Sequence, residues 1–474
     1  MTGLAGKRVL VLGAGASGCA AAQLALAQGA RVTVLDGAAG NAASRRCAAL
    51  QAQGVEFRWG CSGERWEEGE VSLVVVSPGI PLDSPLHRLG ESTGAPMRGE
   101  LEFGASFLKC PLYAVTGTNG KTTTTELLTA CLKATGRRVM AAGNIGVPIS
   151  QVAWENPPLD ALVVEVSSFQ LEHAASFHPQ AAILLNVTPD HLDRHGSLER
   201  YAALKAGLLE NLLPGGVAVY HAALEGRLRL PPECRRARLW LAGEEVCAKG
   251  CPAARDWRVG GDALRRVLPG EDAAEEVVLP RNALRLQGDH NGENALAVVA
   301  LLEALEIPLA DFREALAGFQ CGPHRIQRVG KWRGITFVDD SKATDVDAMV
   351  QALRTLGPSV GKAISLIAGG LDKGCSLTEA KPEIRRYVKN AFLIGECRGR
   401  LQAAWQGEVP CVLCDSLEEA VSQAVRGASQ GGIVLLSPGC ASMDMFRSYA
   451  ERGERFAAAM KGLPPEEALP PSRP

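Results

Sequence analysis

The sequence has no uninterrupted apolar run of about 18 residues, the length a helix needs to cross a bilayer, so no membrane span is expected. Its start, MTGLAGKRVLVLGAGASG, has no charged segment before a long apolar stretch, so no secretory signal peptide is predicted. The 50 Lys and Arg nearly balance the 52 Asp and Glu, and a formal net charge of -2 gives no reason to expect a nucleic-acid partner. These absences favour a cytoplasmic location.

The 14 cysteines also lack the arrangement of a structural metal site. Cys411 and Cys414 form one CxxC, and Cys247 and Cys251 form a CxxxC, but neither has a second pair at zinc-site spacing. Because no secretory signal is evident, the cysteines are predicted to be reduced thiols rather than disulfides.

The chain does have length, glycine and short apolar runs. At about 100–200 residues per domain, 474 residues indicate about three domains. Apolar runs that alternate with helical stretches are typical of parallel, doubly wound sheets. We predict domains at residues 1–99, 100–321 and 322–474, and expect the Pro-rich end, 463–474, to be disordered.

The elements that define these domains are mostly buried strands. In the first two domains, strands are predicted at 8–15, 30–36, 71–80, 161–169 and 181–191. In the third they are predicted at 335–340, 363–370, 391–395 and 432–439. The Ala and Leu periodicity of 291–305 predicts a helix packed on a sheet. The stretch 226–286, rich in Arg, Gly and Pro, is predicted to be irregular or antiparallel.

The stretch AVTGTNGKTTTTELL, residues 114–128, runs from a strand through a loop rich in Gly and Thr into a helix. Gly117 and Gly120 would let several backbone N–H groups point at one anion, and the helix adds its positive N-terminal end. Lys121 would supply a mobile charge for the outer phosphates, and the Thr122 hydroxyl a ligand for Mg²⁺. The pattern therefore predicts a nucleotide loop.

This loop departs from the strict Walker pattern, which would have glycine where the chain has Val115, so the alternative is a turn that only caps a helix. Glu165 follows an apolar strand, and Asp190, His191 and Asp193 follow the next one. Ligands gather at the carboxyl ends of strands in open parallel sheets, which favours a metal–nucleotide site here.

A second glycine loop, GAGASG at 13–18, fits GxGxxG and is followed by Asp36, which lies 36 − 18 = 18 residues further on. This pattern is typical of dinucleotide binding, so an NAD(P)-dependent oxidoreductase is an alternative. That alternative leaves residues 100–474 largely unexplained and offers no catalytic pair for hydride transfer.

Three segments, TGTNGKTT, HNGENALA and GPHRIQ, resemble ATP-binding segments of the Mur ligase family of peptidoglycan synthesis. The resemblance covers nearly the whole chain, is weakest at 226–286, and accounts for Val115. Other segments are similar to the family members that add D-glutamate: SPGI, GELEF, GNIG, EVSSFQLE, DHLDRH, DDSKATD and SPGCASMDMF. The DNPR motif of the relatives that add meso-diaminopimelate is absent.

The resemblance implies an α/β fold of three domains: a Rossmann-like N-terminal domain that binds the UDP substrate, a P-loop-type central domain that binds ATP, and a Rossmann-like C-terminal domain that binds the amino acid. It also implies a cytoplasmic monomer that uses ATP and two Mg²⁺ sites. The implied reaction joins D-glutamate to UDP-N-acetylmuramoyl-L-alanine through an acyl phosphate and a tetrahedral intermediate.

The same resemblance assigns residues to the nucleotide and the metal. The implied catalytic residues are Lys121, His191 and Lys205. The implied metal ligands are Thr122, Glu165, His191 and Lys205. The implied ATP contacts are Gly117, Thr118, Asn119, Gly120, Lys121, Thr122, Thr123, Asn144, Asn291, Asn294, Arg325 and Asp340. His290 and His324 are left out of the catalytic set as ordinary helix or loop histidines.

Lys205 has two interpretations. It borders the apolar stripe of a predicted helix that contains Tyr201, and from the residues alone a lysine that extends its ammonium group to solvent is the expected interpretation. The resemblance instead implies a carbamylated lysine whose new carboxylate helps to hold the second Mg²⁺. Carbamylation needs a neutral amine, which partial burial favours.

The resemblance also assigns the two substrates. For the UDP substrate the implied residues are Gly15, Ala16, Ser17, Asp36, Ser77 and Gly79. For D-glutamate they are Lys342, Thr344, Lys373, Ser442, Met443 and Tyr449. Asp345 stands where the family usually has Asn, and we expect this change to affect a helix cap more than the chemistry. The alternatives left open are another Mur-type ligase, a folylpolyglutamate synthase, and a nucleotide-binding protein without ligase activity.

Overall fold

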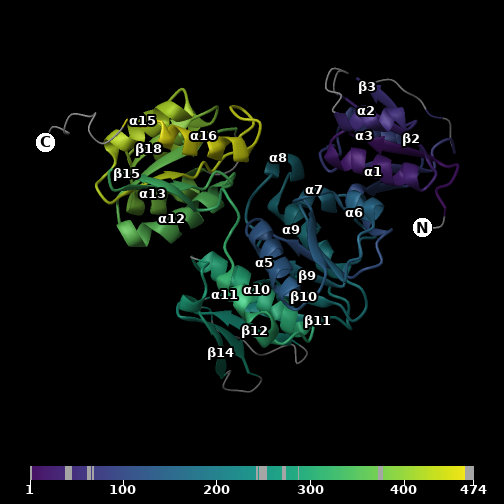
Figure 1. Cartoon of the computed structure of the whole chain (residues 1–474), viewed down its shortest axis with the longest axis horizontal. Helices are drawn as coiled ribbons and strands as arrows, with labels where there is room; N and C mark the ends of the chain where they lie inside the picture. The colour runs from purple at the N-terminus through teal and green to yellow at the C-terminus, as the bar shows by residue number, and fades with distance from the viewer. Residues whose placement is uncertain are drawn as a thin grey trace. The chain divides into compact units, whose positions relative to one another are not determined.

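The structure is a computed structural model (Figure 1) that describes residues 3–37, 45–60, 66, 69–241, 244, 254–268, 274–286, 288–371 and 377–464. Within these ranges the strands form three separate sheets, each with its own helices, which confirms the predicted three-domain α/β architecture. The contacts between residues group the first two sheets into one compact unit, Met1–Val187, Glu199–Arg285 and Gly292–Phe319. The third sheet belongs to a second unit, Thr188–Leu198, Leu286–Asn291 and Gln320–Pro474.

The first sheet has the strand order β3-β2-β1-β4-β5, and all its pairs are parallel. Its strands are β1 (Arg8–Leu12), β2 (Arg31–Asp36), β3 (Glu56–Trp59), β4 (Leu73–Val76) and β5 (Met97–Gly99). Its helices are α1 (Ala16–Ala27), α2 (Arg45–Ala52), α3 (Pro85–Ser92) and α4 (Glu100–Ala105). Val9 and Val11 pack into one buried cluster and Leu10 and Leu12 into another, because alternate residues of a strand point to opposite faces of its sheet.

The second sheet has the order β14-β13-β12-β11-β10-β9-β6-β8-β7. Its strands are β6 (Leu112–Thr116), β7 (Val139–Gly143), β8 (Ala161–Glu165), β9 (Ala181–Leu184), β10 (Val217–His221), β11 (Arg235–Trp240), β12 (Ala254–Val259), β13 (Ala263–Val267) and β14 (Glu275–Pro280). In the order of the sheet, every neighbouring pair from β7 through β8, β6, β9, β10 and β11 to β12 is parallel. The pairs β12–β13 and β13–β14 are antiparallel. The prediction that 226–286 is irregular or antiparallel is therefore right for β13 and β14, which pair antiparallel. It is wrong for β11, which is a regular strand paired in parallel with both β10 and β12.

Along the chain, the helices of this part either lie between its parallel strands or follow β14. They are α5 (Lys121–Ala134), α6 (Ile149–Glu155), α7 (Ser168–Leu171), α8 (Leu192–His195), α9 (Leu198–Glu210), α10 (Asp289–Ala304) and α11 (Arg313–Gly318), with 3₁₀ turns η2 (Ala222–Arg227), η3 (Arg281–Ala283) and η4 (Leu309–Asp311). The strands β8 and β9 end at Glu165 and Leu184, so the predicted strands 161–169 and 181–191 are too long. The predicted helix 291–305 is confirmed as α10.

The third sheet has the order β15-β16-β20-β17-β18-β19, with only β15 and β16 antiparallel among the paired strands described. Its strands are β15 (Gln327–Trp332), β16 (Ile335–Asp339), β17 (Ile364–Gly369), β18 (Val388–Ile394), β19 (Cys411–Leu413) and β20 (Ile433–Leu436). Its helices are α12 (Val346–Val360), α13 (Lys381–Tyr387), α14 (Arg398–Trp405), α15 (Leu417–Gly427) and α16 (Tyr449–Lys461), with the 3₁₀ turn η5 (Leu377–Ala380). All four strands predicted in this domain are confirmed as β16, β17, β18 and β20.

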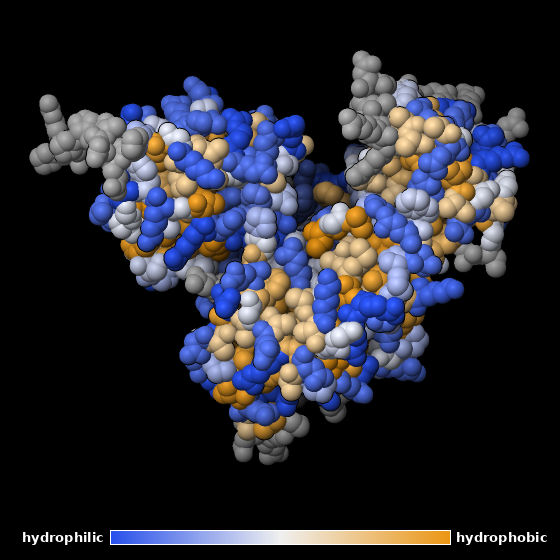
Figure 2. Space-filling view, in the orientation of Figure 1, coloured by the Kyte–Doolittle hydropathy of each residue, from blue (hydrophilic) through white to orange (hydrophobic). Residues whose placement is uncertain are grey.

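None of the helices in the described ranges is both long enough and apolar enough to cross a membrane. On the face drawn in Figure 2, hydrophilic and hydrophobic side chains are mixed over the described surface rather than gathered into one wide apolar band. The tail predicted to be disordered lies, from residue 465 onward, outside the described residues.

Candidate functional site

The predicted nucleotide loop connects the buried strand β6 to the 14-residue helix α5. Gly120, at the start of the helix, has φ of 82°, a left-handed conformation that favours glycine. A Cβ atom at Gly120 would lie 2.3 Å from Oδ1 of Asn294, a buried side chain on α10. The close approach of these two segments therefore depends on glycine at this position.

Asn186, in the loop after β9, fixes the nucleotide loop. Its Oδ1 accepts hydrogen bonds from the backbone N–H groups of Thr118 (3.0 Å) and Asn119 (2.9 Å), and its Nδ2 donates to the Asn119 carbonyl (3.2 Å). The first N–H groups of a helix have no partner within the helix, so those at the start of α5 are the donors suited to an anion. The sequence analysis missed Asn186, although a polar residue after a buried strand was the available signal.

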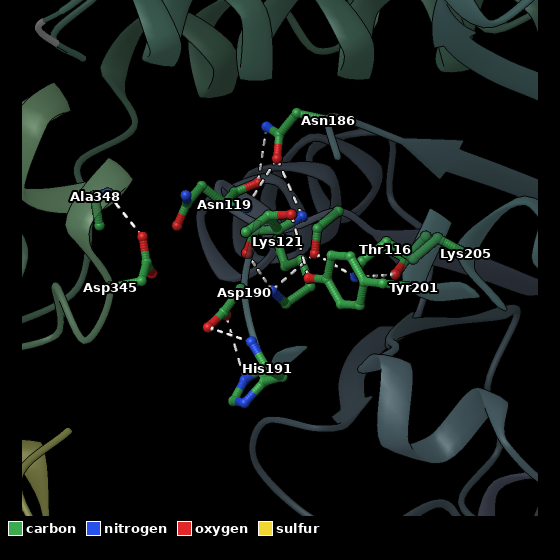
Figure 3. Close-up of polar contacts among 12 residues, drawn as sticks. Thr116, Asn119, Lys121, Asn186, Asp190, His191, Tyr201, Lys205, Asp345 and Ala348 are labelled. Carbon is green, nitrogen blue, oxygen red and sulfur yellow. Dashed lines mark hydrogen bonds and ion pairs between the residues drawn. The ribbon is translucent and has the colours of Figure 1, made fainter. Parts of the chain in front are cut away.

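Two lysines converge on one carbonyl of this loop (Figure 3). Nζ of Lys121 donates to the carbonyl oxygens of Gly117 (2.9 Å) and Thr118 (2.6 Å). Nζ of Lys205, from helix α9, donates to the same Gly117 oxygen at 2.7 Å. Two residues that the sequence singled out, far apart along the chain, are therefore neighbours at the loop.

Lys205 is almost fully buried, with 1% of its surface exposed. Its Nζ lies 4.6 Å from the ring centroid of Tyr201, and the Tyr201 hydroxyl lies 3.2 Å from Oγ1 of Thr118. The interpretation of Lys205 as a lysine that extends its ammonium group to solvent is wrong. The apolar stripe that suggested it turns toward the sheet, and the lysine points inward with it.

Glu165 ends β8 as a buried carboxylate with one oxygen available. Its Oε1 accepts a 2.7 Å hydrogen bond from Nδ2 of Asn144, whereas Oε2 is buried without a hydrogen-bond partner among the described residues. Thr122, in the first turn of α5, is also buried. A free carboxylate oxygen and a threonine hydroxyl are oxygen donors of the kind Mg²⁺ prefers, so these side chains fit the implied metal.

The described residues contain no group of three or more His, Cys, Asp or Glu side chains placed to hold a metal by themselves. This fits Mg²⁺ in nucleotide sites, where one or two protein ligands act together with substrate phosphates and water. It also means that the metal assignment depends on a bound nucleotide.

His191 is held by its neighbour Asp190. The Asp190 Oδ1 accepts from the His191 backbone N–H at 2.9 Å, and Oδ2 lies 3.3 Å from Nε2 of the ring. His191 has φ of 52°, which is uncommon for a residue with a bulky side chain. A carboxylate on one ring nitrogen orients the imidazole, as is common for histidines that bind metals.

The N-terminal loop at 13–18 is closed by short contacts. A Cβ on Gly18 would lie 1.8 Å from the Gly13 carbonyl oxygen, so only glycine fits there. Oδ2 of Asp36 accepts from the Ala14 N–H at 2.7 Å, and the Ser77 hydroxyl donates to the Gly13 carbonyl at 3.4 Å. The structure thus brings the GxGxxG loop, the end of β2 and the end of β4 together.

In the second unit, Asp340 is the central buried acid. It accepts hydrogen bonds from the Ser437 hydroxyl (2.7 Å) and the Ile326 backbone N–H (3.2 Å). Burial raises the pKa of Asp340 to about 7, the neighbouring Asp339 adds to this rise, and the two hydrogen bonds and Arg325 oppose it. Asp340 and the segment that carries Arg325 are therefore adjacent, as their shared assignment to ATP requires.

Of the residues assigned to D-glutamate, the described contacts bring only Lys342 and Tyr449 together. Nζ of Lys342 lies 5.2 Å from the ring centroid of Tyr449, and His324 packs edge-on against that ring. Ser442 is buried and Met443 is 65% exposed in the loop after β20. Lys373 lies outside the described residues.

Arg452 is a buried residue that the sequence analysis missed. Its guanidinium donates to the carbonyl oxygens of Ser341, Gly369, Cys440 and Ala441. Burial lowers the pKa of Arg452 to about 10. The side chain therefore contacts the end of β17 and the loops that follow β16 and β20, and both of these loops carry residues assigned to D-glutamate.

Three family models match in the order of the three sheets. The N-terminal domain of MurD-like Mur ligases matches residues 7–99, the Mur ligase middle domain 115–302, and the Mur ligase glutamate ligase domain 324–440. This chain belongs to the Mur ligase family. This family assignment rules out the alternative of an NAD(P)-dependent oxidoreductase. It also explains why one chain has both a GxGxxG loop and an ATP loop.

Among relatives of this Mur ligase, the UDP-N-acetylmuramoylalanine–D-glutamate ligase of Frankia casuarinae is 41% identical over 468 residues, or 96% of this chain and 94% of that protein. The enzyme of the same name from Pelotomaculum thermopropionicum is 38% identical over 459 residues, 96% and 98% of the two chains. That from Koribacter versatilis is 35% identical over 462 residues, 98% and 99%.

Solved structures show that the fold is shared across the family. The UDP-N-acetylmuramate-alanine ligase MurC from Thermotoga maritima matches with a TM-score of 0.58 and 20% identity, covering 96% of this chain and 99% of that one. The MurF ligase of the same organism, in complex with ADP, matches with a TM-score of 0.57 and 17% identity over 96% of both chains. At this identity the likeness concerns the fold of this Mur ligase alone.

Proposed function

We propose that this Mur ligase uses ATP to join D-glutamate to UDP-N-acetylmuramoyl-L-alanine during peptidoglycan precursor synthesis. The relatives that match nearly the full chain carry this activity in their names. The structural observation that carries the proposal is the convergence of Lys121 and Lys205 on the carbonyl of Gly117, at the N-terminus of α5.

The chemistry requires an activated acid. The carboxylate of the L-alanyl group is a poor acyl donor, because it is anionic and would have to expel an oxide. Transfer of the γ-phosphoryl group of ATP turns it into an acyl phosphate, the amine of D-glutamate attacks the carbonyl carbon, and phosphate leaves from the tetrahedral intermediate. The site must therefore stabilise two anions that approach each other.

Lys121 is the residue proposed to stabilise the transferring phosphoryl group. Its ammonium group is bound to the loop carbonyls and needs only to rotate from them toward the outer phosphates. The first N–H groups of α5 hold the inner phosphates, and Asn186 keeps the loop in shape for them. Asn294, on α10, packs against the same loop and is assigned to ATP together with Asn291.

Bound Mg²⁺ would offset the charge of the phosphates and of the attacking carboxylate. We assign Thr122 and Glu165 to one Mg²⁺ because the free Oε2 of Glu165 is a buried acceptor. His191 and the carbamate of Lys205 are assigned to the second. An Nε2–H directed at Asp190 would fix the tautomer in which Nδ1 is the nitrogen that can bind a metal.

The two remaining substrates are assigned to the terminal domains. The loop at 13–18, with Asp36 and Ser77 beside it, is proposed to bind the UDP pyrophosphate at the N-terminus of α1. The segment around Lys342 and Tyr449 is proposed to bind the carboxylates of D-glutamate. The enzyme is proposed to be a cytoplasmic monomer.

A lysine exchange on α5 tests the proposed role of the nucleotide loop. Lys121→Ala should abolish turnover, because no other side chain on the loop can neutralise the transferring group. Lys133→Ala is the matched control, since Lys133 lies exposed in the last turn of the same helix. Product formation would be followed by mass spectrometry, and normal turnover by Lys121→Ala would remove the loop from the mechanism.

A further inference from the structure

Two cysteines of the C-terminal domain form a buried thiol pair. Cys397 precedes α14 and Cys440 lies in the loop after β20, and both are almost fully buried. Their sulfur atoms are 3.3 Å apart, and the Cys440 S–H points at the sulfur of Cys397. A disulfide needs a separation of about 2.0 Å, so the pair would have to close by only ~1.3 Å.

The residues just before each cysteine lie in turns or loops, although helix α14 begins directly after Cys397. Gly395 has φ of 72° and Gly439 φ of 65°, and each lies next to or close to one cysteine. A turn can shift by about an ångström without breaking the ladder of a sheet. The two sulfurs can therefore approach each other while β18 and β20 stay in place.

The loop that carries Cys440 is tied to the segments around it. The Cys440 carbonyl accepts from Arg452, and Ala441 and Leu371 exchange backbone hydrogen bonds of 2.8 and 3.1 Å. Ser442, assigned to D-glutamate, follows two residues after Cys440. A displacement of Cys440 is therefore transmitted to Ser442 through the backbone.

The two thiols differ in acidity. The hydrogen bond from Cys440 lowers the pKa of Cys397, although burial opposes this effect. The same hydrogen bond, together with burial, raises the pKa of Cys440. Cys397 is thus the sulfur that reaches the reactive thiolate form more readily, and Cys440 is the sulfur that resolves it.

We propose that Cys397 and Cys440 are an oxidisable dithiol whose disulfide weakens the binding of D-glutamate, which makes the C-terminal domain a redox-sensitive site. The geometry that carries this proposal is the 3.3 Å sulfur pair two residues before Ser442. The part that concerns D-glutamate rests on the proposed function, whereas the formation of the disulfide does not.

The oxidant we name is hydrogen peroxide, a small neutral two-electron oxidant. The Cys397 thiolate attacks the O–O bond and becomes a sulfenic acid, and the hydroxide released takes up a proton to form water. The Cys440 sulfur then displaces the sulfenic hydroxyl, which leaves as a second water with the Cys440 proton. Two thiols and one peroxide thus give one disulfide and two waters, and both electrons pass from sulfur to oxygen.

A second close thiol pair provides a contrast within the same chain. Cys19 and Cys47 are buried with sulfurs 3.7 Å apart, but the Cys19 thiol donates to the Ala14 carbonyl at 3.3 Å. The Cys19 thiol is thus directed at a carbonyl oxygen, and the sulfurs of this pair lie further apart than those of Cys397 and Cys440. We therefore expect the pair at 397 and 440 to be linked first.

The test is peroxide treatment of the purified full-length protein, followed by alkylation of free thiols, digestion without reductant and mass spectrometry. We expect one cross-linked peptide that joins Cys397 to Cys440. We also expect the KM for D-glutamate to rise about tenfold, since a misplacement of ~1 Å costs up to about 100-fold in activity. Dithiothreitol should reverse both changes.

Cys397→Ala and Cys440→Ala should lose both responses and retain activity in dithiothreitol. Cys110→Ala is the matched control, because Cys110 is a partly buried thiol outside the pair, and it should respond like the original protein. Absence of the cross-link, or a cross-link that leaves the KM for D-glutamate unchanged, would overturn the proposal. If the reduced enzyme does not ligate D-glutamate at all, the proposed function fails, while the cross-link still reports on the thiol pair.

Discussion

At the scale of single residues, the central feature is the pair of ammonium groups on the Gly117 carbonyl. Lys121 and Lys205 bind that oxygen at 2.9 and 2.7 Å, so two like charges would lie close together in a partly buried place. Burial and a nearby cation both favour the neutral form of an amine. A neutral Lys205 is the form that reacts with carbon dioxide, and the carbamate would turn a repulsive pair into an attractive one.

Lys205→Ala tests this account. The variant should lose most of its activity, and short carboxylates such as formate or acetate should restore part of it by replacing the carbamate. Turnover would be measured with and without the additive, with Lys133→Ala treated in the same way as the control. An unchanged rate in Lys205→Ala would contradict the carbamate role.

Single residues also show the limit of sequence reasoning here. The loop with Gly120 and Lys121 could be located from the sequence, because its glycines, lysine and threonine have a specific spacing between a strand and a helix. The roles of Asn186 and Arg452 were not predicted, because each side chain contacts a segment that is distant in sequence and comes near only in the folded protein. Asn186 was an ordinary polar residue after a strand, and Arg452 an ordinary charge on a helix.

At the scale of elements, helix α4 carries a buried acid. Oε1 of Glu100 accepts from the Ser150 backbone N–H at 2.7 Å, and Oε2 is buried without a hydrogen-bond partner among the described residues. Burial raises the pKa of Glu100 to about 7, and the Ser150 hydrogen bonds oppose this rise. The folded protein therefore holds a proton on Glu100 over a pH range in which the unfolded chain has released it.

This proton makes stability depend on pH. Glu100 contributes no penalty below its unfolded pKa of 4.5, and stability falls as the pH rises from there to about 7. At about 1.4 kcal/mol per unit of pKa, the loss is of the order of 3 kcal/mol. The glutamine in Glu100→Gln does not titrate. The free energy of unfolding of this variant, relative to that of the original protein, should therefore rise between pH 5 and pH 8. Urea denaturation at both pH values checks this, and a constant difference would contradict it.

Asp345 caps the N-terminus of helix α12, because its Oδ1 accepts from the Ala348 N–H at 2.8 Å. We expected that Asp345, in place of the usual Asn, would affect a helix cap, and the structure is consistent with this expectation. Asp345→Ala should cost about 1 kcal/mol of stability, whereas Asp345→Asn keeps a capping oxygen and should cost little. Thermal unfolding of both variants measures the difference, and equal losses would argue against the cap.

The elements that sequence reasoning found are the fully buried ones. Strands such as β1, β8 and β20 consist mainly of consecutive apolar residues because they are buried, and such runs can be recognised in the sequence. The strand β3 was missed because its four residues are half-exposed or exposed. The pairing of β11 with β12 was missed because both strands carry several arginines, which Glu and Asp partners such as Asp256 neutralise only in the fold.

At the scale of the whole molecule, we propose that each of the three domains binds one of the three substrates. The family match extends over nearly the full chain, and the domain named for glutamate ligation covers 324–440. We therefore propose that the C-terminal domain selects the amino acid. The order of the domains along the chain was predictable, because each has its own loop motif.

Amino-acid selection gives a prediction at this scale. With ATP and UDP-N-acetylmuramoyl-L-alanine supplied, D-glutamate should support turnover, and L-glutamate or meso-diaminopimelate should support at least about 100-fold less, because a buried polar site rejects a substrate that leaves its groups unpaired. Initial rates with each amino acid measure this. Comparable rates with meso-diaminopimelate would indicate a different member of the family.

The central claim is that a nucleotide held by the loop of β6 and α5 activates an acid for attack by an amine. The most direct measurement is phosphate release by the purified protein with each substrate omitted in turn. We predict release of ADP and phosphate in equal amounts with the ligated product, and only when ATP, UDP-N-acetylmuramoyl-L-alanine and D-glutamate are all present. Formation of the product without consumption of ATP, or no product with all three substrates, would contradict the account.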